Sequence, residues 1–253
     1  MTTAQTKIAL ITGASRGLGK NTALALGKKG VDTIVTYHSN LEEAKTVVSE
    51  IEAVGAKAVV LQLDISDTKN FDGFVTQLKQ TLQDNWQTQQ FDFLINNAGT
   101  TQHASVAETT EEQFDYLINV HLKGIFFLMQ KLLLTLKDGG RIVNLSSFLT
   151  RSTSLGAAVY ASAKGAIEVL TRYLAKELGA RQIAVNVVAP GPIATEGSVV
   201  RDNPEINRFI ASQTALSRTG LPDDIGGAIA SLLSEENRWI NAQRIEISGG
   251  LFL

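Results

Sequence analysis

The sequence predicts an α/β protein in which a doubly wound, seven-stranded parallel sheet carries helices on both faces, in a single domain covering residues 1–253. Short runs of β-branched and aliphatic residues alternate with longer segments of helical period, the pattern of parallel strands joined by right-handed crossovers. The 253 residues are 44% hydrophobic and 19% charged, which is enough apolar material for one large core.

Seven short apolar segments are predicted to be strands: 7–12, 33–37, 58–63, 91–96, 141–146, 183–188 and 244–247. Six segments of helical period lie between them: 17–29, 41–54, 68–84, 111–137, 156–179 and 223–234. The remaining stretch 189–215 is predicted to be a long loop, and such a loop in a compact domain is usually a lid or a binding element. Doubly wound sheets bind ligands at the carboxyl ends of their strands, so the site is expected there.

The composition narrows the possible functions. A net charge of -2 provides no broad field for nucleic acid or an anionic membrane. The chain has no cysteine, and its three histidines lack the spacing of a metal site, so neither disulfide nor metal chemistry is expected. The amino terminus lacks the order of a secretory signal, and the apolar stretch 125–136 is interrupted by Gln130 and Lys131. We therefore expect a soluble, cytoplasmic protein that acts on a small molecule.

A glycine-rich turn, T-G-A-S-R-G-L-G, follows the first predicted strand and opens the first predicted helix. Glycines allow a sharp turn that brings backbone N–H groups against a pyrophosphate at the positive end of a helix. Their spacing, Gly-x3-Gly-x-Gly, differs from the Gly-x-Gly-x-x-Gly of other dinucleotide folds and from a Walker loop. The turn predicts a dinucleotide site formed by Gly13, Ser15, Arg16, Gly17, Leu18 and Gly19.

The end of the second strand indicates which dinucleotide binds. An acid there would hold the ribose 2′-hydroxyl of NAD and repel the 2′-phosphate of NADP, but the sequence reads Tyr37-His38-Ser39-Asn40. Arg16 can meet a phosphate with two hydrogen bonds, and Ser39 and Asn40 can donate to it. NADP(H) is therefore predicted, with Arg16, His38, Ser39 and Asn40 as the selecting residues.

A tyrosine and a lysine are spaced for acid–base chemistry in Tyr160-Ala-Ser-Ala-Lys164. Four residues apart, they share one face of a helix, and the ammonium is expected to lower the pKa of the phenol towards neutrality. Ser147 ends the fifth strand thirteen residues before Tyr160, where it can bind the same substrate oxygen. Its neighbour Ser146 is the competitor, because only one of two successive strand residues faces the crevice.

These motifs together resemble the short-chain dehydrogenase/reductase family over nearly the whole chain. Thr12-Gly13-x3-Gly17-x-Gly19 resembles its cofactor turn, and Asn96-Asn97-Ala98-Gly99 its fourth-strand motif. Asn119 in I-N-V-H-L-K-G, with Ser147, Tyr160 and Lys164, resembles its catalytic tetrad. Pro190-Gly191 with Ile193 and Thr195 resembles its nicotinamide motif, and Asp64-Ile65 its adenine-binding pair.

The resemblance implies a Rossmann fold, a homotetramer formed through the helices that carry Asn119 and Tyr160, and hydride transfer from NADPH. Tyr-x3-Lys differs from the Tyr-x6-Lys of relatives that reduce enoyl thioesters, and it is similar to 3-oxoacyl-[acyl-carrier-protein] reductase-like ketoreductases. The implied catalytic residues are Asn119, Ser147, Tyr160 and Lys164. The implied cofactor contacts beyond the glycine turn are Asp64, Ile65, Asn97, Ala98, Gly99, Tyr160, Lys164, Pro190, Gly191, Ile193 and Thr195.

The favoured function is reduction of a ketone or 3-oxoacyl carbonyl, with Ser147 orienting the carbonyl oxygen, Tyr160 donating the proton and Asn119 holding a water that links Lys164 to solvent. Two alternatives stay open: an alcohol dehydrogenase running in the oxidative direction, and a non-catalytic NADP-binding module. The residues around the crevice, 148–155, 192–213 and 249–253, are mostly small or apolar and favour an uncharged substrate. His121 lies about 200° around the helix from Asn119, so a structural or interface role is expected for it.

Overall fold

A computed structural model describes residues 6–253, so the start of the amino-terminal segment, for which no secretory signal is expected, lies outside the described residues. One seven-stranded sheet runs through the molecule in the order β3-β2-β1-β4-β5-β6-β7, and every neighbouring pair is parallel. The predicted doubly wound fold is confirmed. The strands are β1 Ile8–Ile11, β2 Asp32–Tyr37, β3 Ala58–Gln62, β4 Phe91–Asn96, β5 Leu136–Leu145, β6 Ala184–Pro190 and β7 Arg244–Ile247.

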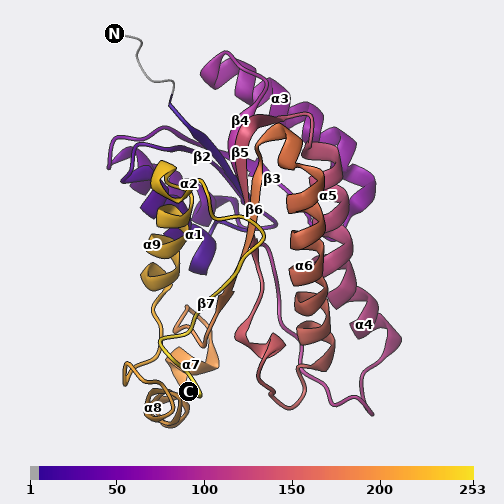
Figure 1. The fold of residues 1–253 in the computed structure, drawn as a ribbon, viewed down its shortest axis with the longest axis vertical. Helices are drawn as coiled ribbons and strands as arrows, with labels where there is room; N and C mark the ends of the chain where they lie inside the picture. Colours follow the sequence, from indigo (N-terminus) through magenta and orange to yellow (C-terminus); the bar gives the residue numbers. More distant parts are fainter. Residues whose placement is uncertain (1–5) are drawn as a thin grey trace.

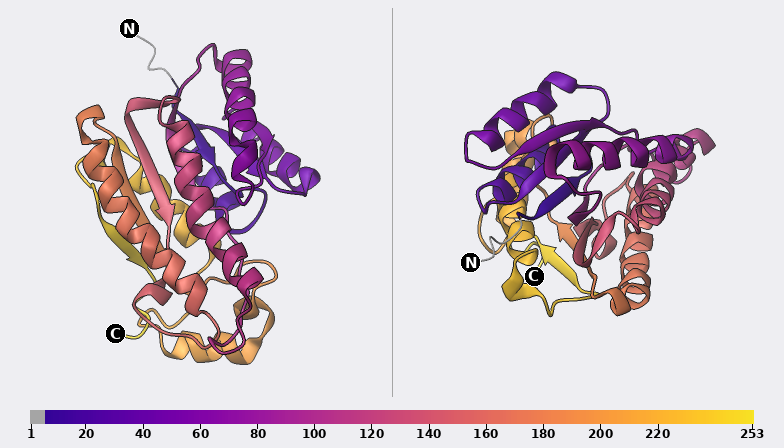
Figure 2. Two further views of the ribbon diagram at one scale, coloured as in Figure 1. Left: turned by 90° about the vertical axis from the view of Figure 1, so that its right-hand side faces the viewer. Right: turned by 90° about the horizontal axis from the view of Figure 1, so that it is seen from above.

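Helices cover both faces of this sheet. In Figure 1, α1, α2 and α9 lie on one side of it, and α3, α4, α5 and α6 on the other. Their bounds are α1 Gly17–Gly27, α2 Leu41–Glu52, α3 Phe71–Trp86, α4 Glu111–Ile118, α5 Gly124–Leu132, α6 Ala158–Glu177 and α9 Pro222–Leu232. Figure 2 shows the two layers of helices from two further directions. Within residues 6–253, no helix combines the length and the apolar character needed to cross a membrane.

The core is divided in two by the sheet, because successive strand side chains point to opposite faces. On β1, Leu10 packs into the cluster beneath α3, α5 and α6, while Ile11 packs into the cluster beneath α1, α2 and α9. Strand order reverses between β1 and its neighbour β4, so the connections leave these two strands in opposite directions. The crevice of a doubly wound fold lies at the carboxyl ends of such a strand pair.

The predicted helix 111–137 is wrong in its extent. It is divided into α4, a π-helical turn Asn119–Lys123 and α5, and β5 already begins at Leu136. A capping box starts α4, in which the Thr110 hydroxyl accepts from the backbone N–H of Gln113. The π turn brings Gly124 against the backbone at Ile65, where a β-carbon on residue 124 would overlap the Ile65 carbonyl oxygen. The helix is therefore interrupted where it contacts the loop after β3. The periodicity of the sequence does not reveal this contact.

The predicted loop 189–215 is also more ordered than expected, because it contains α7 Val199–Asp202 and α8 Pro204–Ser212. The Asn203 side chain caps α8 by accepting from the N–H groups of Glu205 and Ile206, and Pro204 occupies the first helical position. The carboxyl terminus then pairs with the segment after α8, through a bridge between Thr214 and Leu251. The loop and the carboxyl terminus therefore form one wall.

Candidate active site

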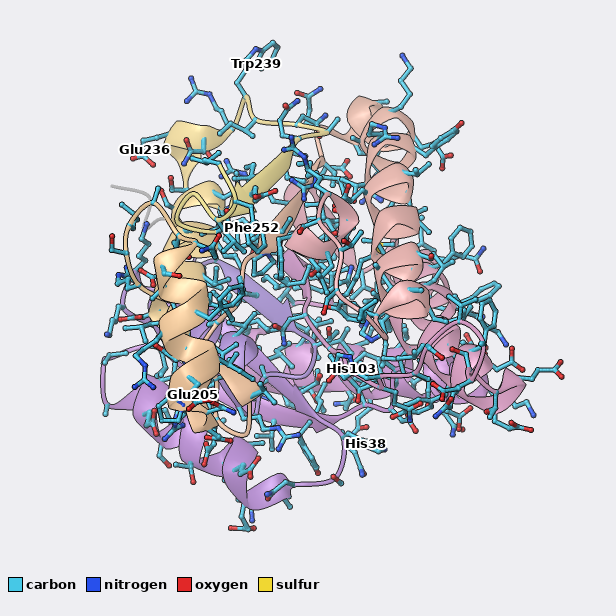
Figure 3. The ribbon with its side chains drawn as sticks, turned by 90° about the horizontal axis from the view of Figure 1, so that it is seen from below. His38, His103, Glu205, Glu236, Trp239 and Phe252 are labelled. Carbon is cyan, nitrogen blue, oxygen red and sulfur yellow. The ribbon has the colours of Figure 1, made fainter. Side chains whose placement is uncertain are left out.

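The predicted cofactor residues lie at the carboxyl ends of five strands: 13–19 after β1, 38–40 after β2, 64–65 after β3, 97–99 after β4 and 190–195 at the end of β6. Figure 3 views this end of the molecule, which also carries α7 and α8, and labels His38 and Glu205 of α8. The structure therefore brings together the residues that the sequence predicts for one site.

The glycine turn has the shape that a pyrophosphate needs. Gly13 and Gly17 have φ of 62° and 58°, the left-handed conformation in which glycine is unstrained. A β-carbon on Gly19 would lie 2.5 Å from the Asn97 amide nitrogen, so this position allows the close approach of α1 to β4. Arg16 stands at the start of α1 without a side-chain cap, and the first turn contains no acidic residue. The N–H groups of the first helical turn, which have no partner within the helix, and the positive helix end therefore suit a phosphate anion.

Asn97 braces the glycine turn from within. Its side-chain nitrogen donates to the carbonyl oxygens of Thr12 and Gly13, at 2.9 Å each. The Thr12 hydroxyl accepts in turn from the backbone N–H groups of Asn97 and Ala98. Both amide hydrogens of Asn97 are therefore used inside the protein, and this residue shapes the cofactor turn.

Asn96 links neighbouring strands through a buried chain of hydrogen bonds. Its side-chain nitrogen donates to Asn144 on β5 at 2.8 Å, and Asn144 donates to Thr171 on α6 at 2.9 Å. Asn96 therefore braces the neighbouring strands and, through Asn144, ties β4, β5 and α6 together beside the site.

The acid-free end of β2 is exposed, as are Arg16, His38, Ser39 and Asn40. Asn40 also has a structural role that the sequence did not predict. Its side-chain oxygen caps α2 by accepting from the Glu43 N–H at 3.2 Å. His38 lies 3.4 Å from the carboxylate of Asp64. Burial raises the pKa of Asp64, but hydrogen bonds from Ser66 and the nearby His38 outweigh burial and hold this pKa below its usual range. Asp64 is therefore an ionised partner for His38.

The turns after β1 and β6 face each other across the site. A β-carbon on Gly17 would lie 3.8 Å from the methyl group of Thr195. A β-carbon on Gly191 would lie 2.9 Å from Ser248, so the chain after β6 approaches β7 closely only because this residue is glycine. Ile193 is buried and forms a bridge with Gly220. These contacts place the predicted nicotinamide motif directly opposite the glycine turn.

Ser146 and Ser147 directly follow β5, and both contact α6. The Ser146 hydroxyl donates to the Glu168 carboxylate at 2.7 Å, whereas the Ser147 hydroxyl accepts from the Leu149 N–H and interacts with the Tyr160 phenol. Ser147 is therefore the one of the two serines that lies beside the tyrosine.

An ion pair missed by the sequence analysis supports the turn that carries Ser147. One carboxylate oxygen of Glu168 accepts from Thr150 at 2.7 Å and from Arg244 at 2.8 Å, in addition to Ser146. Arg244 also donates to Thr150 at 3.1 Å. Glu168 and Arg244 are far apart in sequence, and only the fold brings them together.

Tyr160 and Lys164 are neighbours on α6, but the pKa of the phenol differs from the expectation. The Lys164 ammonium donates to the Leu145 carbonyl at 2.7 Å and lies 5.6 Å from the centre of the Tyr160 ring. Burial raises the pKa of Tyr160 above its usual value, while the hydrogen bond with Ser147 acts in the opposite direction. Burial also lowers the pKa of Lys164 to about 8. The predicted lowering of the tyrosine pKa is therefore wrong in direction, because desolvation dominates.

His121 lies beside Tyr160 in the candidate active site, a position that the sequence did not predict. The residue is buried, and its ring packs edge-on against Tyr160 with the ring centres 4.9 Å apart. Burial and the charge of Lys164 lower the pKa of His121 to about 3. Among residues 6–253, the Asn119 side chain makes no direct hydrogen bond to Tyr160 or Lys164; the resemblance places a water between Asn119 and Lys164.

Acid should destabilise the protein through His121. Its folded-state pKa of about 3 lies below the ordinary value of 6.5, so stability is complete above pH 6.5 and is lost as the pH falls towards 3. At pH 5 the loss attributable to this one residue is about 2 kcal/mol. Urea unfolding at pH 8 and pH 5 should show this loss in the wild type but not in His121→Asn. A variant at the exposed His103, His103→Asn, serves as the control and should keep the wild-type pH dependence.

A dinucleotide cradle at the switch point of a doubly wound sheet, with serine, tyrosine and lysine beside it, defines a cofactor-dependent oxidoreductase. The chain belongs to the short-chain dehydrogenase/reductase family. The family model that matches it, over residues 13–252, is described as enoyl-(acyl carrier protein) reductase. The predicted family and enzyme class are confirmed.

The relatives are similar over nearly their whole length. An uncharacterised oxidoreductase of Methylorubrum extorquens is 38% identical, with 97% of each chain covered. A tetrahydroxynaphthalene reductase of Pestalotiopsis fici is 35% identical, over 96% of this chain and 91% of that protein. The structure of an angucycline C-6 ketoreductase with bound NADP has a TM-score of 0.93 and 35% identity, over 98% of this chain and 96% of the other.

Proposed function

We propose that this protein uses NADPH to reduce the carbonyl group of a fused-ring aromatic ketone, with Tyr160 as the proton donor. The observation that carries this proposal is the arrangement of three side chains beside the glycine turn. The Tyr160 phenol lies next to the Ser147 hydroxyl, and the Lys164 ammonium lies 5.6 Å from the centre of the Tyr160 ring. A carbonyl oxygen placed between the serine and the tyrosine could accept a hydrogen bond from one and a proton from the other.

The chain is an NADP-dependent oxidoreductase acting on carbonyl groups, as the sequence predicts, since the NADP-bound ketoreductase is similar to it over 98% of its length. The glycine turn would hold the pyrophosphate. Arg16 in that turn, with His38, Ser39 and Asn40 after β2, would bind a 2′-phosphate. When bound, the cofactor supplies a hydride to the carbonyl carbon.

Each residue around Tyr160 has a task in that reaction. The Ser147 hydroxyl donates a hydrogen bond to the carbonyl oxygen and orients it, and the Tyr160 hydroxyl gives this oxygen its proton. Lys164, with a pKa of about 8, is mostly charged at pH 7 and stabilises the phenolate that remains. Glu168 and Arg244 keep the turn carrying Ser147 in place.

Two independent observations support a fused-ring substrate. The relatives include hydroxynaphthalene reductases and angucycline ketoreductases. In addition, large apolar side chains are exposed on the segments that are predicted to form the crevice wall: Leu155, Val199, Phe209, Phe252 and Leu253. A flat apolar molecule would cover such side chains, which are costly to leave in water.

The test is a panel of substrates, in which the loss of NADPH absorbance at pH 7 measures turnover. The panel contains a fused-ring ketone such as 2-tetralone, a simple aliphatic ketone, and a 3-oxoacyl thioester. We expect the highest kcat/KM for the fused-ring ketone. A preference for the thioester would reject the fused-ring proposal in favour of a 3-oxoacyl reductase, and the absence of turnover on every carbonyl would reject the reaction itself.

Arg16→Ala should weaken NADPH binding roughly 10- to 100-fold, because a charge-assisted hydrogen bond contributes about 1.5–3 kcal/mol. Binding of NADH, which has no 2′-phosphate, should stay within about twofold of the wild type. Fluorescence titration of both cofactors measures the two affinities. Arg238→Ala removes another exposed arginine, in the segment before β7, and controls for the general loss of positive charge. Equal weakening of both cofactors would reject the selecting role of Arg16.

We also propose that the protein forms a homotetramer through α4, α5 and α6. Six aromatic or branched apolar side chains are exposed on these helices: Phe114, Tyr116, Phe126, Phe127, Val169 and Tyr173. Such a surface favours contact with another subunit. Light scattering coupled to size-exclusion chromatography should give four times the chain mass for the wild type and a smaller species for Phe127→Glu. A monomeric wild type would reject this assembly.

A further inference from the structure

His121 is held in a defined orientation at the active site. Its Nε2 lies 2.7 Å from the carbonyl oxygen of Thr100, and its ring meets Tyr160 almost at a right angle, at 87°. Gly99 leaves room for the ring, since a β-carbon at that position would lie 2.9 Å from His121 Cε1. The fold therefore provides space, a hydrogen bond and an aromatic neighbour for this one side chain.

The contact with Thr100 determines which ring nitrogen carries the proton. Nε2 also lies 3.4 Å from the Thr100 N–H, but its contact with the Thr100 carbonyl oxygen is much shorter. A carbonyl oxygen can only accept a hydrogen bond, so the shorter contact assigns the proton to Nε2 and leaves the lone pair on Nδ1. Nδ1 is buried and has no hydrogen-bond partner among residues 6–253. Buried polar atoms normally have a partner, and an acceptor without one next to the reacting groups points to a ligand or a water.

Lys164 is a charged donor that lies against Tyr160, the residue that His121 also contacts. Its ammonium has three N–H groups, of which one is given to the Leu145 carbonyl. The ammonium lies 5.6 Å from the centre of the Tyr160 ring, and the His121 ring lies 4.9 Å from the same centre. The charge of Lys164 also acts on His121 strongly enough to contribute to the lowering of its pKa. The side chains of Lys164 and His121 therefore both lie against Tyr160.

We propose that His121, and not Asn119, is the positioning residue of this site: its Nδ1 accepts from a water hydrogen-bonded to the Lys164 ammonium, and its ring holds the Tyr160 phenol in place. This inference rests on the proposed reduction. After the phenol gives its proton to the carbonyl oxygen, the phenolate takes a proton from Lys164, and Lys164 regains one from solvent through the water that His121 anchors. His121 itself stays neutral, which its lowered pKa ensures across the working range.

Three variants separate this role from simple packing. His121→Phe keeps an aromatic ring against Tyr160 but removes the acceptor, whereas His121→Asn restores an acceptor without the ring. Asn119→Ala tests the competing assignment, in which Asn119 anchors the water. His103→Phe makes the same change at an exposed histidine, is the matched control and should keep the wild-type kcat. With NADPH and the best ketone, we expect His121→Phe to lower kcat about 10- to 100-fold and to move the pH profile of kcat, with KM little changed. His121→Asn should regain most of kcat, and Asn119→Ala should stay within about threefold of the wild type.

A second measurement needs neither cofactor nor turnover. In ¹⁵N-histidine NMR spectra, the signals of His121 are those lost in His121→Phe. We expect them to show a neutral ring with the proton on Nε2 throughout pH 5–8. A ring protonated on Nδ1 would overturn the proposal, as would wild-type kcat and pH profile in His121→Phe, or a loss in Asn119→Ala as large as in His121→Phe.

The two proposals fail in different ways. If the wild type turns over no carbonyl compound, the proposed function fails, and the NMR spectra still decide whether Nδ1 is the free acceptor. If the wild type is active and His121→Phe equals it, only the role of His121 is rejected.

Discussion

Tyr160→Phe should lower kcat for carbonyl reduction by about 10³-fold, since a positioned general acid contributes roughly 10²–10⁴-fold to such a reaction. The substitution removes one oxygen and leaves the ring that packs against His121, so the fold and the cofactor turn should be unchanged. Steady-state NADPH oxidation with an accepted ketone measures the loss. Binding of NADPH, followed by fluorescence, should stay close to the wild-type value.

A second tyrosine on the same helix provides the control. Tyr173 is exposed on α6, and Tyr173→Phe makes the same chemical change away from the crevice. It should keep wild-type kcat. If Tyr160→Phe also turned over at the wild-type rate, the phenol would not be the proton donor, and the proposed mechanism would have to be abandoned.

Gly124→Ala should destabilise the protein by at least about 3 kcal/mol, or prevent its folding, at the upper end of what overpacking usually costs. A β-carbon on residue 124 would overlap the Ile65 carbonyl oxygen and would lie 2.8 Å from the Asn119 carbonyl oxygen. Both are backbone atoms, so relief requires moving α5 away from the loop after β3. The shift would also disturb His121, which lies in the π turn immediately before Gly124.

Gly227→Ala is the matched control for this prediction. Gly227 lies inside α9, and a β-carbon there would meet no atom within 4 Å. Alanine loses less conformational freedom in a helix than glycine, so this variant should be more stable than the wild type by about 0.4–1 kcal/mol. Urea unfolding of the three proteins gives the comparison. A Gly124→Ala protein as stable as Gly227→Ala would show that the contact with Ile65 has no energetic importance.

His121 shows the limit of reasoning from helical rotation. The angular separation of Asn119 and His121 predicts that they face different sides of the helix, and His121 is the one that meets Tyr160. The separation alone cannot say which of the two faces the site. The burial of His121 depends on its packing against Tyr160, which helical rotation does not describe.

The amino-acid sequence by itself determined the doubly wound α/β fold class, the glycine turn, the acid-free end of β2 and the motif of Ser147, Tyr160 and Lys164. These features depend on short-range periodicity and on residues close together in the chain, so they can be read from the letters. Only the tertiary structure decided the π turn at Asn119–Lys123, the helices within 189–215, the support of Ser147 by Glu168 and Arg244, and the direction of the Tyr160 pKa. Each of these depends on burial or on contacts between segments distant in sequence, which exist only once the chain has packed.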